Sequence, residues 1–67
     1  MDEGSQQAFL RHAMKALGMT YDEFASRLRI SRKTLENWLA GEGSSSFRKM
    51  PDMARAFVEE ILMNARR

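Results

Sequence analysis

Four basic side chains surround one serine in the stretch RLRISRKTLENW, residues 27 to 38. They are Arg27, Arg29, Arg32 and Lys33, with Ser31 between them. Guanidinium and ammonium groups donate strong hydrogen bonds to phosphate oxygens, and together they attract polyanions. The stretch therefore predicts a surface that contacts nucleic acid. The alternative interpretation is a solvated charged face without a specific partner.

The basic charge is concentrated in the middle of the chain. The whole sequence of 67 residues has a net charge of only +2, but residues 27–51 hold six basic and two acidic residues, a net charge of +4. Residues 1–26 sum to −2 and residues 52–67 to zero. A local basic block on a small domain is typical of proteins that bind DNA or RNA.

The composition excludes several other functions. The chain has no cysteine and a single histidine, His12, so it offers no disulfide and no set of metal ligands. One histidine and scattered serines do not form a catalytic set of a nucleophile, a general base and a residue that orients the base. We therefore expect no enzyme activity and no cofactor. A chain of this length leaves no room for a sensor domain, and we expect no small-molecule ligand.

The sequence also predicts where the protein acts. It has no secretory leader and no apolar run long enough to span a bilayer, so we expect no membrane partner. The expected location is the cytoplasm of a bacterial or phage-infected cell, at the nucleoid.

Two helices are predicted before the basic stretch. Ser5 is a suitable N-cap for a helix over residues 5–17, and Gly18 is suited to end it. Thr20 and Glu23 fit a capping box that begins a second helix over residues 20–28.

Two more helices are predicted after it. Ser31 can cap a third helix over residues 31–40, with Trp38 on its inner face, and Pro51 suits the first turn of a fourth helix over residues 51–65. Residues 42–49 are predicted to form a loop. The predicted fold class is therefore all-α, a compact four-helix domain over residues 5–67 that follows a frayed tail, residues 1–4.

The short turn between the second and third helices is the most informative spacing. Only two residues join them, so the helices must cross at a steep angle, as in a helix-turn-helix. In that unit the N-terminal turn of the second helix enters the major groove, and its partial positive charge adds to the attraction for phosphates.

Residues 19–41, MTYDEFASRLRISRKTLENWLAG, resemble the helix-turn-helix core of the Cro/C1-type, phage repressor-like transcriptional regulators. The resemblance rests on a gapless pattern of Thr20, Glu23, Phe24, Ala25, Leu28, Ile30, Ser31, Arg32, Thr34, Leu35, Trp38 and Gly41. Two positions differ from the family. Arg29 stands where a turn glycine is usual, so it must adopt a positive φ or use another turn, and Tyr21 stands where a polar phosphate contact is usual.

The resemblance implies roles for individual residues. The family's base-reading positions fall on Arg32, Lys33 and Asn37. The chemistry of these residues suits that role, since arginine or lysine can pair with guanine and asparagine with adenine. Thr34 and Glu36 are further candidates for base contacts. The candidate phosphate contacts, which position a protein without reading sequence, are Tyr21, Arg27, Arg29, Ser31, Arg48 and Lys49.

The last predicted helix has an apolar band wider than one packing seam requires. We expect Met53, Ala54, Phe57 and Ile61 to close the core. That leaves Val58, Leu62 and Met63 without a partner inside one subunit, and such surplus apolar residues often mark an interface. The alternative is that they cover a small core unevenly.

The function predicted from these features is a homodimeric transcriptional regulator, expected to be a repressor. It would bind double-stranded DNA at an inverted-repeat operator through the major groove. Proteins of this size and motif include Cro-like proteins, autoregulators encoded beside anti-CRISPR genes, and antitoxins. The alternative function is a protein-interaction module, an antitoxin or an inhibitor of a host protein, that uses the helix-turn-helix as a scaffold.

Overall fold

The computed structural model describes residues 5–41 and 43–65, and this part of the chain folds into four helices. They are α1 (Gln6–Leu17), α2 (Tyr21–Leu28), α3 (Arg32–Leu39) and α4 (Asp52–Ala65). The predicted all-α fold is confirmed. Each helix begins one residue later than predicted, and α3 also ends one residue earlier. In the first three helices the predicted first residue is the N-cap, which is not itself helical. The tail predicted for residues 1–4 lies outside the described residues.

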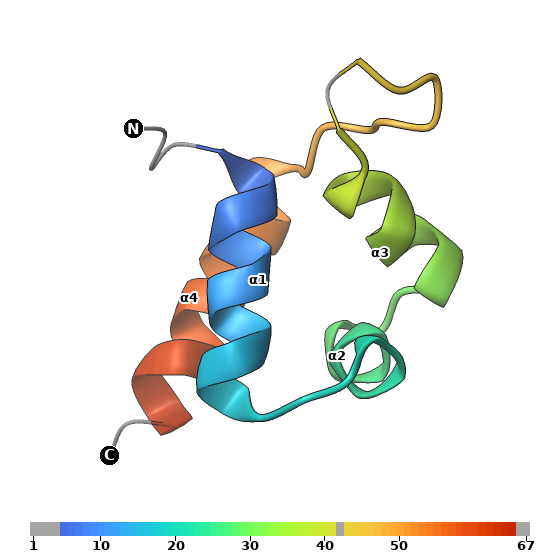
Figure 1. The fold of residues 1–67 in the computed structure, drawn as a ribbon. Coiled ribbons are helices and arrows are strands. Elements are labelled where there is room, and N and C mark those ends of the chain that lie inside the picture. Colours follow the sequence, from blue (N-terminus) through green and yellow to red (C-terminus); the bar gives the residue numbers. More distant parts are fainter. Residues whose placement is uncertain (1–4, 42, 66–67) are drawn as a thin grey trace.

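The four helices form two halves around one core. α1 and α4 lie side by side, while α2 is seen nearly end-on below α3, so that these two axes cross at a steep angle (Figure 1). α2 packs against α3 and α4, and α1 packs against α3 and α4. The molecule measures 38 × 28 × 20 Å. The steep crossing predicted from the two-residue turn is therefore observed.

Local capping explains where the first two helices begin. The Ser5 side chain accepts a hydrogen bond from the Ala8 backbone at 3.0 Å. At α2, the Thr20 hydroxyl accepts from the Glu23 backbone N–H at 3.2 Å, and the Glu23 carboxylate accepts from the Thr20 N–H at 2.9 Å. This is the predicted capping box, which satisfies two N–H groups that a helix start leaves without partners.

The turn between α2 and α3 is made by Arg29 in the left-handed region, at φ 62° and ψ 39°. Its N–H bonds back to the carbonyls of Ala25 and Ser26, which ends α2. Glycine adopts this conformation without strain, whereas a residue with a Cβ does so at a cost of about 1–2 kcal/mol. Arg29 thus takes the first of the two alternatives that the sequence left open.

The core is built from all four helices and the segment before α4. Phe24, Leu10, Leu35 and Val58 are its largest fully buried side chains. Trp38 is 7% exposed and fills the core, as predicted. Met50, which the sequence assigned to no element, is also buried. No polar or charged residue is buried in the described part of the chain.

The face that α4 turns to the core differs from the prediction. Val58 was expected to lie unpartnered at a dimer interface, but it is 0% exposed and belongs to the core. Met53 and Phe57 were expected in the core, but they are 83% and 41% exposed. The physical reason is the width of the apolar band on α4: it contains two adjacent stripes, and the one centred on Val58 and Ile61 faces α1 and α2.

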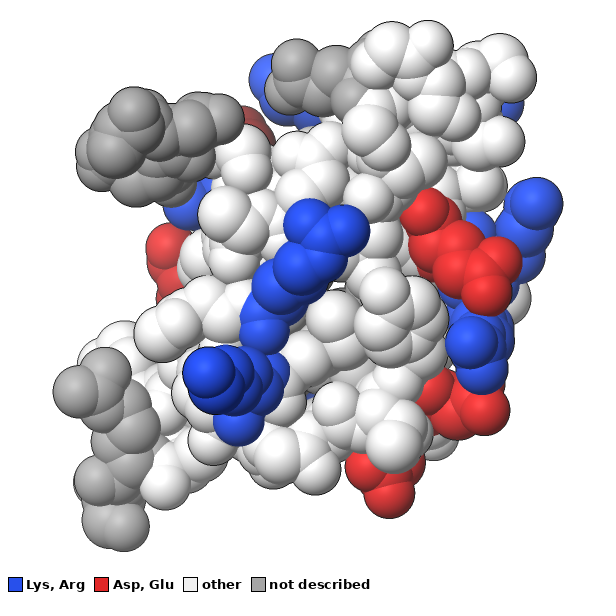
Figure 2. Space-filling model, in the orientation of Figure 1, with Lys and Arg blue, Asp and Glu red and all other residues white. Residues whose placement is uncertain are grey.

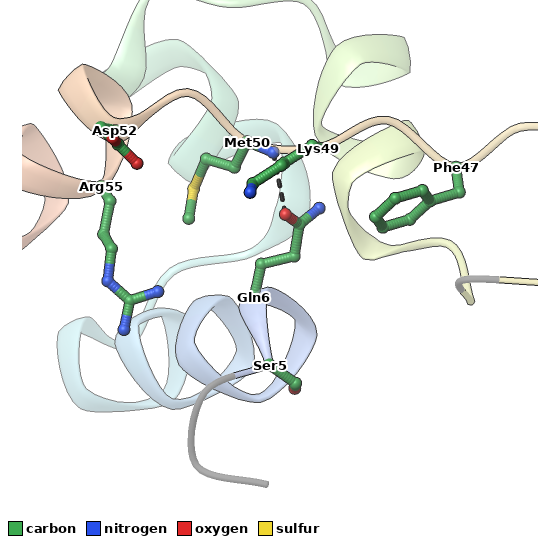
Figure 3. A pocket seen from close by; sticks show the side chains of 7 residues that line it. All are labelled: Ser5, Gln6, Phe47, Lys49, Met50, Asp52 and Arg55. Carbon is green, nitrogen blue, oxygen red and sulfur yellow. Dashed lines mark hydrogen bonds between the residues drawn. The ribbon is translucent and has the colours of Figure 1, made fainter.

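Gln6 and Gln7, in the first turn of α1, tie the loop after α3 to the helices. The Gln6 amide nitrogen donates to the carbonyls of Trp38 and Arg48 at 2.9 and 2.7 Å, and its oxygen accepts from the Met50 N–H at 2.8 Å. Gln7 donates to the Ala40 carbonyl at 2.7 Å. Figure 3 shows Gln6 reaching from α1 to this segment in a pocket of about 450 Å³, with Phe47 on one side and Arg55 on the other.

Candidate nucleic-acid interface

The N-terminal turn of α3 presents most of the predicted base-reading residues to solvent. Ser31 caps the helix by accepting a hydrogen bond from the Thr34 N–H at 3.1 Å. Arg32, Lys33 and Glu36 are exposed, while Thr34 and Asn37 are half-buried. Positions i, i+1, i+4 and i+5 of a helix lie on one side, so residues 32, 33, 36 and 37 share a face.

Arg32 is held on three sides by its neighbours. Its Nε donates to a Glu36 carboxylate oxygen at 3.0 Å, and its Nη1 donates to an Asp22 carboxylate oxygen at 3.2 Å. The guanidinium carbon lies 5.3 Å from the centre of the Tyr21 ring. The hydrogen bonds to Glu36 and then to Asp22 raise the pKa of Arg32 above its already high usual value, so the side chain stays a cation.

The other candidate base readers have fewer contacts. In the described residues, the side chains of Lys33 and Asn37 have no hydrogen bond or ion pair. The Asn37 carbonyl accepts from the Arg48 N–H at 3.1 Å, which attaches the loop to α3. The hydroxyls of Ser31 and Thr34 are 3.0 Å apart and share a hydrogen bond.

Only some of the predicted phosphate contacts lie beside the base-reading face. Tyr21 and Ser31 are the first residue of α2 and the cap of α3, and both touch the neighbours just described. Arg29 is exposed in the turn between the two helices. Arg27 turns toward α4 instead, where its guanidinium carbon lies 5.7 Å from the centre of the Phe57 ring.

Arg48 and Lys49 belong to the loop before α4. The Arg48 Nη1 donates to the Phe47 carbonyl at 2.8 Å and to the Ser45 carbonyl at 3.4 Å, so this side chain is folded onto its own loop. Lys49 lines the pocket beside Gln6 (Figure 3). Both residues are exposed, and the backbone bond to Asn37 fixes the loop at the C-terminal half of α3.

Asp22 was not predicted as part of this site. The sequence showed it only as an acidic residue in the first turn of α2, where a carboxylate is favourable for the helix dipole. Its contact with Arg32 depends on how α2 crosses α3, which spacing alone does not fix. Along the edge where these helices lie, basic and acidic side chains are interleaved (Figure 2).

Of the predicted dimer residues, Val58 is in the core, and Leu62 and Met63 lie at the far end of α4. Met63 is 67% exposed, and Leu62 is half-buried in a groove between α1 and α4. A second apolar surface lies near the start of α4. We call it the α4 patch, and it consists of Ile30, Trp38, Pro51, Met53, Ala54 and Phe57.

The arrangement of α2, the Arg29 turn and α3 defines a helix-turn-helix domain. The helix-turn-helix family model matches residues 10–57, from the middle of α1 to the first half of α4. The chain belongs to this family, of the Cro/C1 type, and is a DNA-binding regulator. Searches among curated proteins and solved structures found no significant match.

The family is regulatory and generally not enzymatic. In the described residues, no helix has the length and apolar character needed to cross a membrane.

Proposed function

We propose that the protein is a homodimeric repressor that binds an inverted-repeat DNA operator through the major groove. The observation that carries this proposal is one face of α3 beside the start of α2, on which the exposed Arg32 and Lys33 of its first turn and the half-buried Asn37 lie together. A helix-turn-helix uses this half of its second helix to contact base edges. Binding would place the protein at the nucleoid of a bacterial or phage-infected cell.

The side chains on this face suit the chemistry of base recognition. Arg32 and Lys33 can donate to guanine O6 and N7, and Asn37 can pair with the N6 and N7 edge of adenine. Lys33 and Asn37 have no competing side-chain bond in the described structure, so they meet DNA unpaired. Thr34 can touch a thymine methyl, and Glu36 can accept from cytosine N4.

The proposed phosphate contacts surround this face. Arg29 and Ser31 lie at the α2–α3 turn, and Tyr21 lies at the start of α2 beside Arg32. These residues would fix the depth and angle of α3 in the groove. The remaining proposed contacts, from Arg27, Arg48 and Lys49, would extend along the backbone on either side.

The proposed dimer contact is the C-terminal end of α4, through Leu62 and Met63. Met63 is 67% exposed and follows the half-buried Leu62, so a partner surface that covered both would remove apolar area from water. A two-fold dimer would separate the recognition helices by about 34–36 Å, one turn of DNA. Bound at a promoter, such a dimer would exclude polymerase.

A protein-interaction module on the same scaffold is the second candidate function. The observation that favours it is the α4 patch, which brings the exposed Met53 and Phe57 next to Trp38 and Ile30. A surface of this kind can bind an apolar segment of another protein. This function predicts DNA binding that is weak and salt-sensitive, without preference for sequence.

The experiment that tests the proposal is selection of bound duplexes from a random DNA pool at about physiological salt. Non-specific binding falls there to a Kd of roughly 10⁻⁴–10⁻⁶ M, so only specific sites are enriched. We expect an enriched inverted repeat whose half-sites are about one helical turn apart. A folded protein that enriches no sequence would favour the interaction module instead.

Two single substitutions separate base reading from phosphate contact. Asn37→Ala should relax the preference at one base pair of each half-site, with a loss of about 1–3 kcal/mol of discrimination. Arg29→Ala should weaken binding to all sequences equally. It should also reduce the slope of log Kd against log salt concentration by about one unit for each protomer. Titrations of the selected duplex and a scrambled duplex at several salt concentrations measure both effects. An unchanged base preference for Asn37→Ala would remove it from the base-reading set.

A further inference from the structure

The contacts of Arg32 join the two helices of the DNA-binding unit. Asp22 stands at the second position of α2, and Glu36 stands one turn beyond Arg32 on α3. Both carboxylates bond to the same guanidinium, at 3.2 and 3.0 Å, and the Tyr21 ring lies against it. Arg32 is thus fixed between α2 and α3 before any DNA is present.

Two carboxylates at this position oppose simple attraction to DNA. Non-specific affinity increases with the number of cations that neutralise phosphates, and each nearby acid reduces the local positive potential. The side chain of Asp22 is 72% exposed, and it lies at the end of α2 that faces the DNA backbone in a helix-turn-helix. An acid there lowers affinity for any phosphate backbone, so a benefit of Asp22 for DNA binding must lie in specificity rather than in affinity.

The geometry of the guanidinium identifies that benefit. Arginine has five N–H donors, and the bonds to Asp22 and Glu36 use one on Nη1 and one on Nε. One hydrogen on Nη1 and both on Nη2 remain, enough for the two bonds that guanine O6 and N7 accept. A long side chain that is already ordered also loses less conformational entropy on binding.

We propose that Asp22 is a positioning residue for specificity: it holds Arg32 in the direction of a base edge and repels phosphates from the same guanidinium. This inference rests on the proposed sequence-specific binding of DNA. It assigns a role to a residue of α2 that itself contacts no base. Glu36 acts from the other side of the guanidinium, and the Tyr21 ring restricts its motion.

The test is the ratio of Kd for a scrambled duplex to Kd for the selected operator, measured for Asp22→Asn. We expect both duplexes to bind more tightly, because an acid near the phosphates is removed, but the ratio should fall about three- to tenfold, within the contribution of one base contact. The operator gains less than the scrambled duplex, because Arg32 is no longer held toward its base edge. Glu60→Gln removes the same charge from an exposed position on α4 and is the matched control; its ratio should stay as in the wild type. Asp22→Glu keeps the carboxylate and should restore most of the ratio.

A double-mutant comparison shows whether Asp22 acts through Arg32. In an Arg32→Ala background, Asp22→Asn should leave the ratio unchanged, because the side chain it positions is gone. The inference is overturned if Asp22→Asn keeps the wild-type ratio or if its effect persists without Arg32. In either case the operator preference of the wild type still stands. If the wild type shows no preference for any operator sequence, the proposed function and this inference are both overturned. Circular-dichroism melting of each variant confirms that the compared proteins are folded.

Discussion

Arg29 combines a left-handed backbone conformation with a side chain proposed to contact phosphate. A Cβ in the left-handed conformation costs about 1–2 kcal/mol, partly offset in glycine by the greater freedom of the unfolded chain. Arg29→Gly should therefore be more stable than Arg29→Ala by about 1 kcal/mol in urea unfolding. Both variants lose the same charge, so alanine controls for electrostatics. Equal stability would mean that the turn relaxes without a positive φ.

The same pair of variants tests the phosphate contact at Arg29 separately from its backbone. Both should bind every duplex more weakly than the wild type, and by the same factor, because the guanidinium is absent from both. If Arg29→Gly instead bound as well as the wild type, the arginine would have no role at the DNA surface. The proposed contact would account for an arginine at a position whose positive φ favours glycine.

The capping residues were predictable because caps depend on neighbours within three positions. Ser5, Thr20 with Glu23, and Ser31 all make the bonds that their spacing predicted. The contact of Asp22 with Arg32 was not predictable in this way, because it joins residues ten positions apart across a helix crossing. The sequence thus predicted which residues share the face of α3 proposed to read bases, but not the contact that holds Arg32.

At the scale of the elements, the loop before α4 depends on one side chain of α1. Gln6 makes three hydrogen bonds to the backbone of α3 and of this loop, whereas Gln7 makes one, to Ala40. Gln6→Ala leaves these backbone groups without their partners, and we expect it to lower the free energy of unfolding by about 1–3 kcal/mol. Gln7→Ala should lower the free energy of unfolding by less, because only one hydrogen bond is lost. Chemical unfolding of both variants measures the difference.

Hydrogen exchange shows whether that cost is local. In Gln6→Ala, the Met50 amide should exchange faster, together with the Arg48 amide that bonds to Asn37. Equal losses of stability in the two variants would contradict a specific role for Gln6. Sequence reasoning did not detect this role, because a glutamine in the first turn of a helix is expected to face solvent.

The orientation of α4 shows a second limit of sequence reasoning. Periodicity predicted the end of the helix at residue 65 and its start to within one residue, because Pro51 and the apolar spacing are local signals. It did not select between the stripe through Met53 and Phe57 and the stripe through Val58 and Ile61, since both are apolar at helical spacing. Only packing against α1 and α2 decides which stripe is buried, and it buries Val58.

At the scale of the whole molecule, this orientation leaves two exposed apolar surfaces that a dimer could use. One is the proposed contact at Leu62 and Met63, and the other is the α4 patch with Met53 and Phe57. Each would place the two recognition helices differently, because the C-terminal end of α4 lies on the opposite side of the molecule from α3 (Figure 1). The half-site spacing of the operator follows from which surface is used.

Charge substitutions at one exposed methionine on each surface distinguish them. Met63→Glu and Met53→Glu change side chains that are 67% and 83% exposed, so neither should disturb the fold of a protomer. If the dimer forms through the end of α4, Met63→Glu should sediment as a monomer and Met53→Glu as a dimer, because a buried unpaired carboxylate opposes association. The reverse result would move the interface to the α4 patch. If both variants remain dimeric, neither methionine belongs to the contact. If the wild type is itself a monomer, the proposed inverted-repeat operator loses its two-fold basis.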